Sequence, residues 1–267
     1  MSRPDRILQI SIGPAGQPGL TWSDPMTMEA RIKGWRSAKP DEAELKIWGL
    51  SDVSQTRLLQ PGLVVVVRAG EETAGEIFRG LIARGGTRTV RDGPSWVTEI
   101  RAADSRSVTR STAFARSYPP GTSSDLILQD IVAAMGLPIG FRGTLPSTTY
   151  PAGWAYMGQA AAALTRVLQP LDCLWMIQGG ALHLLGPTDS LPGTAPLIQA
   201  DSGLIGSPTT GKKVEWKQYF DARVRPGGRV VLKSEFASGT YTVVERQHMV
   251  GSGQSGAMWE TRAKGVE

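Results

Sequence analysis

Short apolar and alternating runs, separated by turn-forming residues, cover the first third of the chain. Ala43–Trp48 alternates with period two, which predicts a strand with one buried face. Leu63–Arg68 is a continuous apolar run after Pro61-Gly62, which predicts a strand buried on both faces. Two further strands and the turn between them are predicted at Glu76–Ile82, Trp96–Ala102 and Arg91–Pro94. The pattern is typical of an all-β region.

The middle of the chain changes to helical spacing. Thr122–Asp125 offers an N-cap with a carboxylate in the first turn, and apolar residues follow at Leu128, Val132 and Met135. Gly136, with Pro138 after it, predicts the end of this helix.

A second, alanine-rich helix is predicted from Tyr156 to Leu168, before Pro170. Leu174–Gln178 and Ala181–Leu185 follow as a predicted hairpin with a Gly179-Gly180 turn. Residues 106–198 are therefore expected to form a small α+β insert.

The all-β character returns after residue 198, and it returns as a repeat. Pro61-Gly62 followed by Val65–Val67 corresponds to Pro226-Gly227 followed by Val230–Leu232. Later correspondences are Gly75–Phe78 with Gly239–Thr242, and Trp96–Ala102 with Trp259–Ala263. The shared order predicts a mainly β fold, α+β overall, in which two related tube-type β-barrel modules, residues 1–105 and 199–267, flank the insert.

Composition and length place the chain among ordinary folded proteins. It has 267 residues, of which 40% are hydrophobic and 20% charged. Leu63–Val67 is the longest aliphatic run and is far too short to cross a bilayer, so we expect no membrane insertion. The N-terminal MSRPDRILQ lacks the apolar region of a secretory signal. Cys173 is the single cysteine, which excludes an intrachain disulfide and a cysteine-based metal site.

The formal net charge of +5 has a local origin. The segment from Arg79 to Arg116 holds eight arginines against Asp92, Glu99 and Asp104, which equals the whole excess. These arginines lack interleaved aromatic residues and do not form one helical stripe. We interpret them as solvated strand faces and loops, with a nucleic-acid or subunit-interface patch as the alternative.

Gly251-Ser-Gly253-Gln-Ser-Gly256 matches the G-x-G-x-x-G fingerprint of dinucleotide-binding turns. A strand precedes the motif, but only eleven residues follow it. They cannot hold the helix, second strand and acidic ribose ligand of such a site. We therefore interpret the glycines as the tip of a hairpin between two antiparallel strands.

The remaining candidate residues predict structural roles. We expect His248 to be a strand-end histidine hydrogen-bonded to its turn, His183 to pack or face solvent, and Cys173 to be a core residue. The carboxylate pairs Asp41/Glu42 and Glu71/Glu72 are expected to be solvated in polar loops. No catalytic, cofactor-binding or metal-binding residue is predicted, and no enzyme activity.

The order of several short motifs resembles the baseplate or tail hub proteins of long-tailed bacteriophages, over nearly the full chain. The motifs are Ala43–Leu50, Pro61-Gly62, Ile77–Gly80, Asp92-Gly93, Met135–Leu137, Gly203–Pro208, Arg225–Gly227 and Gly239–His248. Two details depart from the family. Gly49 stands where an asparagine is frequent, and the turn after His248 is longer and lacks the usual carboxylate.

The resemblance implies a structural virion protein, made in the host cytoplasm and located in the phage tail or baseplate. Three chains with two barrels each would form a homotrimeric ring of pseudo-sixfold symmetry. Such a hub joins the sixfold tail tube, or a distal tail protein, to the threefold central spike. Its channel would pass the tape measure protein and, transiently, DNA.

Two hypotheses from other classes remain open. One is a phage-associated hydrolase with its cleft in the α+β insert. The other is a basic nucleic-acid-binding β-protein, whose duplex binding would weaken steeply with salt.

Overall fold

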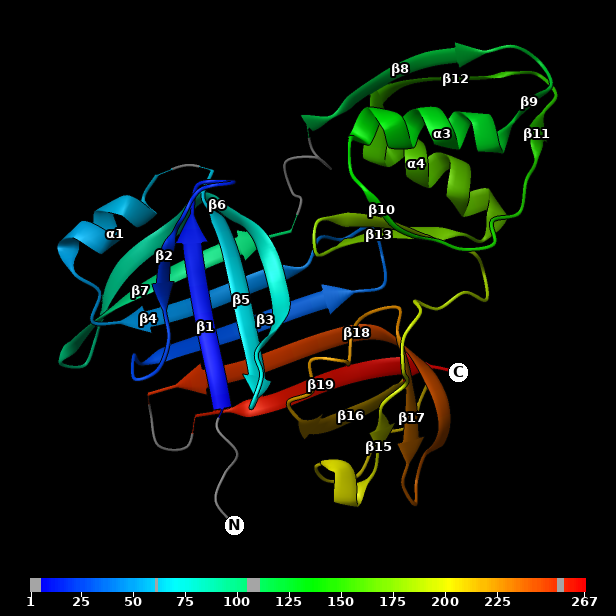
Figure 1. Ribbon diagram of the computed structural model, residues 1–267. Coiled ribbons are helices and arrows are strands. Elements are labelled where there is room, and N and C mark those ends of the chain that lie inside the picture. The colour runs from blue at the N-terminus through cyan, green and yellow to red at the C-terminus, as the bar shows by residue number, and fades with distance from the viewer. Residues whose placement is uncertain (1–5, 61, 105–110, 254–256) are drawn as a thin grey trace. The chain divides into compact units, whose positions relative to one another are not determined.

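The computed structural model describes residues 6–60, 62–104, 111–253 and 257–267 (Figure 1). Strands hold 51% of the chain and helices 14%, so the predicted mainly β, α+β class is confirmed. The chain divides into two compact units. Unit 1 comprises Met1–Trp35, Asp41–Asp104 and Pro192–Glu267, and unit 2 comprises Arg36–Pro40 and Ser105–Leu191. The three-part division 1–105, 106–198 and 199–267 stays a prediction.

Unit 1 is built on one large sheet with a short helix, α1 (Asp52–Leu58), and a 3-10 helix, η2 (Ala200–Ser202). Its N-terminal strands are β1 (Arg6–Gly13), β2 (Leu20–Trp22), β3 (Met28–Trp35), β4 (Glu42–Trp48), β5 (Val64–Glu71), β6 (Gly75–Asp92) and β7 (Ser95–Ala103). Its C-terminal strands are β15 (Leu197–Ile198), β16 (Val214–Tyr219), β17 (Arg229–Lys233), β18 (Ser238–Ser252) and β19 (Trp259–Val266). The strand order is β15-β17-β18-β3-β4-β7-β6-β5-β1-β2, and β19 joins β18 to β16.

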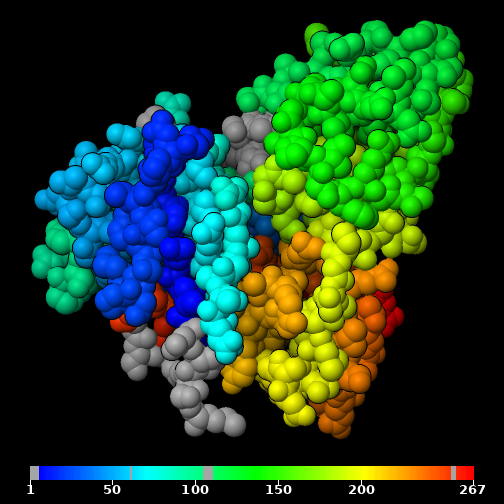
Figure 2. All heavy atoms as spheres, in the orientation of Figure 1, coloured from blue at the N-terminus to red at the C-terminus, as the bar shows by residue number. Residues whose placement is uncertain are grey.

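The first core of unit 1 lies where β1 and β5 cross β3 and β4 (Figure 1). Alternation places Leu8, Ile10 and Ile12 of β1 against the inward residues of β3, β4 and β7. In Figure 2, β1 and β5 lie side by side at the surface of this unit, as their antiparallel register requires. The predicted strand at Leu63–Arg68 forms as β5, but its burial alternates, so the expectation of two buried faces is wrong. Solvent reaches the face of β5 that does not cover the core.

The second core of unit 1 is formed by β15, β16, β17, β19 and the first half of β18. The second half of β18 continues past this core and pairs antiparallel with β3 along its full length, from Glu245↔Trp35 to Ser252↔Met28. We call this pairing the β18–β3 seam. Because of this seam, the N-terminal and C-terminal strands of unit 1 form a single sheet.

Unit 2 packs two helices, α3 (Ser124–Met135) and α4 (Ala160–Leu168), around its own core. Its strands are β8 (Ala113–Tyr118), β9 (Thr122–Ser123), β10 (Ile139–Arg142), β11 (Thr149–Tyr150), β12 (Trp154–Gln159), β13 (Leu174–Gln178) and β14 (Ala181–Leu185), and the 3-10 helix η1 (Gln169–Leu171) follows α4. The predicted caps of the first helix are confirmed, because the Ser123 side chain accepts from the Leu126 N–H and Gly136 is left-handed. The β13–β14 hairpin is also confirmed, with positive φ at Gly179 and Gly180.

The predicted start of the second helix at Tyr156 is wrong. Residues Trp154–Gln159 form β12 instead, paired antiparallel with β8 from Trp154↔Tyr118 to Gln159↔Ala113. Trp154 and Tyr156 favour a strand, and their rings stack on each other with centroids 5.8 Å apart. Strand pairing therefore overrides the helical pattern until Ala160, where α4 begins.

Candidate functional site

The most distinctive surface of unit 1 is the side of the sheet opposite its cores. Along β3, β4, β7, β16, β18 and β19, most residues that alternate with the core-facing ones are charged. Seven are cationic and seven acidic, and we call this set the charged face. Its members are Glu29, Arg31, Lys33, Glu42, Glu44, Lys46, Glu99, Arg101, Glu215, Lys217, Glu245, Glu260, Arg262 and Lys264.

Glu260 organises the C-terminal part of the charged face. Its carboxylate pairs with Lys217 Nζ, and its Oε1 lies 2.9 Å from Arg262 Nη2. Lys217 and Arg262 stand directly opposite each other in the register of β16 and β19, where like charges repel. Burial alone would raise the pKa of Glu260, but hydrogen bonds from these two cations hold it below its ordinary value. One carboxylate thus compensates two neighbouring cations.

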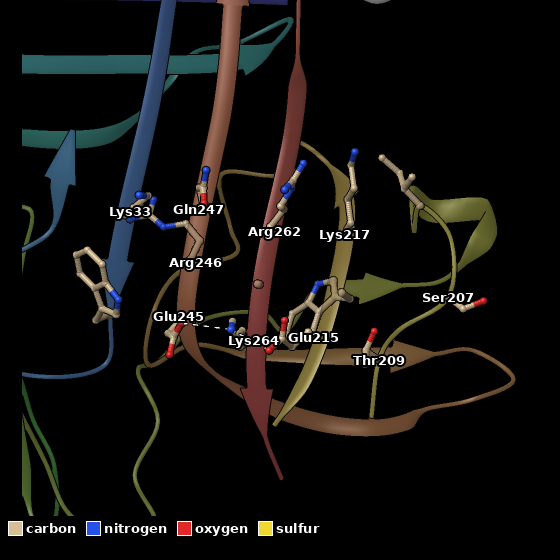
Figure 3. Close-up of a pocket in the computed structure, with 14 residues that line it drawn as sticks. Lys33, Ser207, Thr209, Glu215, Lys217, Glu245, Arg246, Gln247, Arg262 and Lys264 are labelled. Carbon is tan, nitrogen blue, oxygen red and sulfur yellow. Dashed lines mark ion pairs between the residues drawn. The ribbon is translucent and has the colours of Figure 1, made fainter. Parts of the chain in front are cut away.

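A second network lies one row further along the same strands. Lys264 Nζ lies 2.8 Å from Glu215 Oε1 and 3.9 Å from Glu245 Oε2. Glu245 also accepts a 2.9 Å hydrogen bond from Lys213 Nζ. Figure 3 shows Lys264, Glu215 and Glu245 with Arg262 and Gln247, which project from neighbouring strands. Charges in this row are balanced by cross-strand partners rather than left for a ligand.

An open hollow of about 500 Å³ lies over these rows (Figure 3). Mostly polar and charged side chains of β3, β16, β18 and β19 line it, with Trp35, Trp216 and Ala263 among them, together with Ile205, Ser207 and Thr209 from the segment before β16. The lining carries cations and carboxylates together. This mixture resembles a polar protein surface more than a specific small-molecule pocket, which is mostly apolar with few polar groups.

A buried ion pair lies beneath the β18–β3 seam. Arg246 Nη2 donates a 2.9 Å hydrogen bond to Asp41 Oδ2, and the two side chains are only 4% and 8% exposed. Burial raises the pKa of Asp41 to about 7, against the opposing effect of the Arg246 charge. Burial likewise lowers the pKa of Arg246. The expectation that Asp41 is solvated is therefore wrong, because it anchors β4 to β18.

His248 lies two residues further along β18 and is fully buried. A 2.8 Å hydrogen bond joins its Nδ1 to Thr261 Oγ1 of β19, and the Phe220 ring packs against the imidazole at 5.0 Å. Burial, with the nearby Arg246 charge, lowers the pKa of His248 well below its ordinary value. The expected strand-end position and turn contact are wrong, since β18 continues to Ser252 and the partner is on the next strand.

The remaining candidate residues from the sequence lie in strands, in turns or in a hydrophobic core. Gly251 lies within β18 and Gly253 follows that strand at positive φ, while residues 254–256 of the glycine motif lie outside the described residues. Cys173 is buried in the core of unit 2, as expected, and burial raises the pKa of its thiol. His183 is half-buried on β14. Glu71 and Glu72 are exposed, as expected, and Arg6 lies 3.8 Å from Glu71.

Among the described residues, no group of three His, Cys, Asp or Glu side chains could hold a metal ion. No helix in the same part of the chain is long and apolar enough to cross a membrane.

Three of the six described arginines in the basic segment from Arg79 to Arg116 are paired with acidic neighbours. Arg79 lies 2.6 Å from Glu76, Arg88 lies 2.6 Å from Glu99, and Arg116 lies 3.9 Å from Asp130. Arg106 and Arg110 fall outside the described residues. The geometry agrees with the interpretation of solvated strand faces.

Comparison with known proteins gives matches of structure without matches of sequence. No protein-family model matches the chain, and no curated protein matches it. The tail protein from Neisseria meningitidis has a TM-score of 0.67 at 11% identity, and the match covers 97% of this chain and 96% of that one. The 43 kDa tail protein of prophage MuSo2 from Shewanella oneidensis has a TM-score of 0.63 at 9% identity, with 97% and 98% covered.

A third similar structure is the E. coli c3393 protein, a component of the type VI secretion system with structural similarity to the T4 bacteriophage tail proteins gp27 and gp5. Its TM-score is 0.62 at 10% identity, and the match covers 96% of this chain and 76% of that one. The chain therefore has the fold of phage tail proteins, as the resemblance of its motifs implied.

Proposed function

We propose that this chain is a structural component of a phage tail or baseplate. The observation that carries the proposal is the match over 97% of this chain and 96% of the Neisseria tail protein. The two chains share one fold over these lengths at 11% identity, and this shared fold is what supports a role in a tail.

Within the tail, the proposed place is the hub, as a homotrimer between the sixfold tail tube and the threefold spike. Support comes from unit 1, where two strand pairs, β4 with β7 and β16 with β19, belong to one sheet. Three chains would present six such strand pairs to a sixfold partner. Each chain would also contribute one spike-binding surface, which gives three surfaces to a threefold partner. Similarity to the type VI component with gp27-like and gp5-like structure supports a spike as the second partner.

The charged face is the proposed lining of the hub channel. Its seven cations and seven carboxylates cancel, although the whole chain carries +5. A balanced polar surface offers neither a net field to hold DNA phosphates nor an apolar patch to hold the tape measure protein. Passage of both through the channel would therefore meet little adhesion.

No observation on the described residues favours the hydrolase alternative. Within the described part of unit 2, the thiol of Cys173 is buried and its pKa is raised, by burial first and then by Asp189 and Asp172. A nucleophilic cysteine needs the opposite shift.

Light scattering after size-exclusion chromatography tests the hub. The expected result is a particle with three times the 28.6 kDa mass of the chain, alone or after mixing with the tail tube and spike proteins encoded by neighbouring genes. Absence of the chain from purified tails, or a monomer that none of these partners binds, would overturn the proposal.

A further inference from the structure

The two halves of unit 1 repeat the same strand register. Lys46 of β4 stands opposite Glu99 of β7, and Lys217 of β16 stands opposite Arg262 of β19. When residues are counted outward from these two positions, the registers of the two strand pairs stay aligned. Ala43–Trp48 then corresponds to Val214–Tyr219, and Trp96–Ala102 corresponds to Trp259–Gly265. The correspondence aligns AELKIW with VEWKQY and Trp96 with Trp259. It relates the strands residue by residue.

The same correspondence relates the long strands β6 and β18. Val90 stands opposite Val97 of β7, and Met249 stands opposite Glu260 of β19, so Val90 corresponds to Met249. The second half of β18 has partners on both edges, β19 on one and β3 on the other. The second half of β6, Thr87–Asp92, pairs with β7 on one edge, and no described strand pairs with its other edge. This open edge of β6 is where β3 would lie if the repeat were complete.

A counterpart of β3 exists in the C-terminal half. Met28 and Arg31 of β3 stand opposite Ile47 and Glu44 of β4. Leu204 and Thr209 form bridges with Gln218 and Glu215, which are the residues of β16 that correspond to Ile47 and Glu44. The segment Leu204–Thr209 thus lies beside β16 at the position that β3 has beside β4, with two more residues between its bridges than β3 has. Its far edge has no described strand partner.

We propose that the open edge of β6 in one copy pairs with Leu204–Thr209 of the next copy, so that a second copy of this chain occupies the edge. The intermolecular seam repeats the β18–β3 seam, with Val90 opposite Thr209 as Met249 is opposite Arg31. This pairing rests on the proposed hub, and the open edge of β6 and Leu204–Thr209 are the two surfaces that would close its ring. The contact joins two different surfaces, so it is head-to-tail and does not form a twofold dimer, and with the threefold rotation of the proposed hub it closes into a ring.

Local sequence limits the length of this seam. Pro208 lacks an N–H donor and Gly206 has positive φ, so Leu204–Thr209 cannot offer a full ladder of hydrogen bonds. The intermolecular seam is therefore shorter than the β18–β3 seam. An irregular edge of this kind also resists pairing with copies of itself.

Cysteine cross-linking tests the seam. In the double variant Val90→Cys/Thr209→Cys, mild oxidation or a short bismaleimide should convert most chains into covalent dimers and trimers, which denaturing gels resolve. Each single variant should remain monomeric on the same gels, and buried Cys173 is retained in all of them. Met249→Cys/Arg31→Cys is the matched control, because these residues pair within one chain and should link without any increase in mass.

The outcomes separate the seam from the hub. A trimer by light scattering that gives no covalent oligomer, while the control pair links, overturns the seam and leaves the hub standing. Covalent dimers from Val90→Cys alone would also overturn it, because they indicate that two β6 edges pair with each other. A chain that is monomeric with and without its tail partners overturns both proposals.

Discussion

Asp41 and Arg246 are 205 residues apart in the sequence, yet their side chains form a 2.9 Å hydrogen bond beneath the β18–β3 seam. The pair lies between the two cores of unit 1. Replacing one partner leaves the other charge buried without compensation, which costs about 3–5 kcal/mol in such pairs. We therefore expect Asp41→Ala to lower the free energy of unfolding by that amount in urea denaturation above pH 7, where Asp41 is ionised.

A double variant gives the control for this pair. Asp41→Leu/Arg246→Met removes both charges and keeps the branched shape of one side chain and the unbranched stem of the other, so it should recover most of the loss, because paired apolar replacements are often neutral or better. A loss of less than about 1 kcal/mol in Asp41→Ala would contradict the assignment.

Gly34 gives an independent probe of the same contact. A Cβ at this position of β3 would lie 2.6 Å from Arg246 Nη2 and 2.7 Å from Asp41 Oδ2. Gly34→Ala should therefore push the two side chains apart and destabilise unit 1 by about 1–3 kcal/mol. The control is Gly75→Ala at the start of β6, where no atom lies within 4 Å of an added Cβ. Equal unfolding free energies for the two variants would show that the ion pair tolerates displacement.

Local signals predicted most strands of unit 1 but not this contact. The β4 and β7 strands follow from alternation and from turn residues such as Gly93, which are properties of neighbouring positions. Asp41 follows Pro40 in a polar stretch and has no local sign of burial. Its environment is created by β18, which reaches it only after the chain has passed through unit 2.

Two errors have the same physical origin in strand pairing. The glycines after His248 suggested that its strand ends there, but β3 and β19 hold β18 on both edges and extend it to Ser252. The alanine-rich pattern before Leu168 suggested a helix from Tyr156, but β8 pairs with this stretch first. Partners distant in sequence decided both boundaries.

Asp41 and His248 should contribute to the pH dependence of the unfolding free energy with opposite sign. The pKa of Asp41 is raised from 3.8 to about 7, so between these values the folded state holds a proton that the unfolded state has lost. Its contribution to the unfolding free energy therefore falls as pH rises from about 4 to 7. The pKa of His248 lies well below 6.5, so its contribution falls as pH drops below 6.5.

Between pH 4.5 and 6.5 the two slopes should largely cancel in the unmodified chain. Asp41→Asn should leave a free energy of unfolding that rises with pH, by up to about 1.4 kcal/mol per unit. His248→Asn, whose amide can replace Nδ1 toward Thr261, should leave one that falls with rising pH. Urea titrations at three pH values measure the slopes, and parallel slopes in both variants would refute the assignment.

Glu260 should be the most sensitive carboxylate of the charged face. Its side chain is 9% exposed and pairs with both Lys217 and Arg262, which face each other across the β16–β19 pair. Glu260→Gln removes the shared carboxylate and leaves two like charges opposed, so we expect a loss of about 1 kcal/mol in unfolding free energy. Glu215→Gln is the matched control, because Glu215 is 52% exposed and pairs with one lysine, and its loss should stay below about 0.5 kcal/mol. Repulsion between the two cations is screened by salt, so the Glu260→Gln loss should shrink when the urea titration is repeated at 1 M salt. Equal losses in the two variants, or a Glu260→Gln loss that salt leaves unchanged, would show that Glu260 does not neutralise this pair.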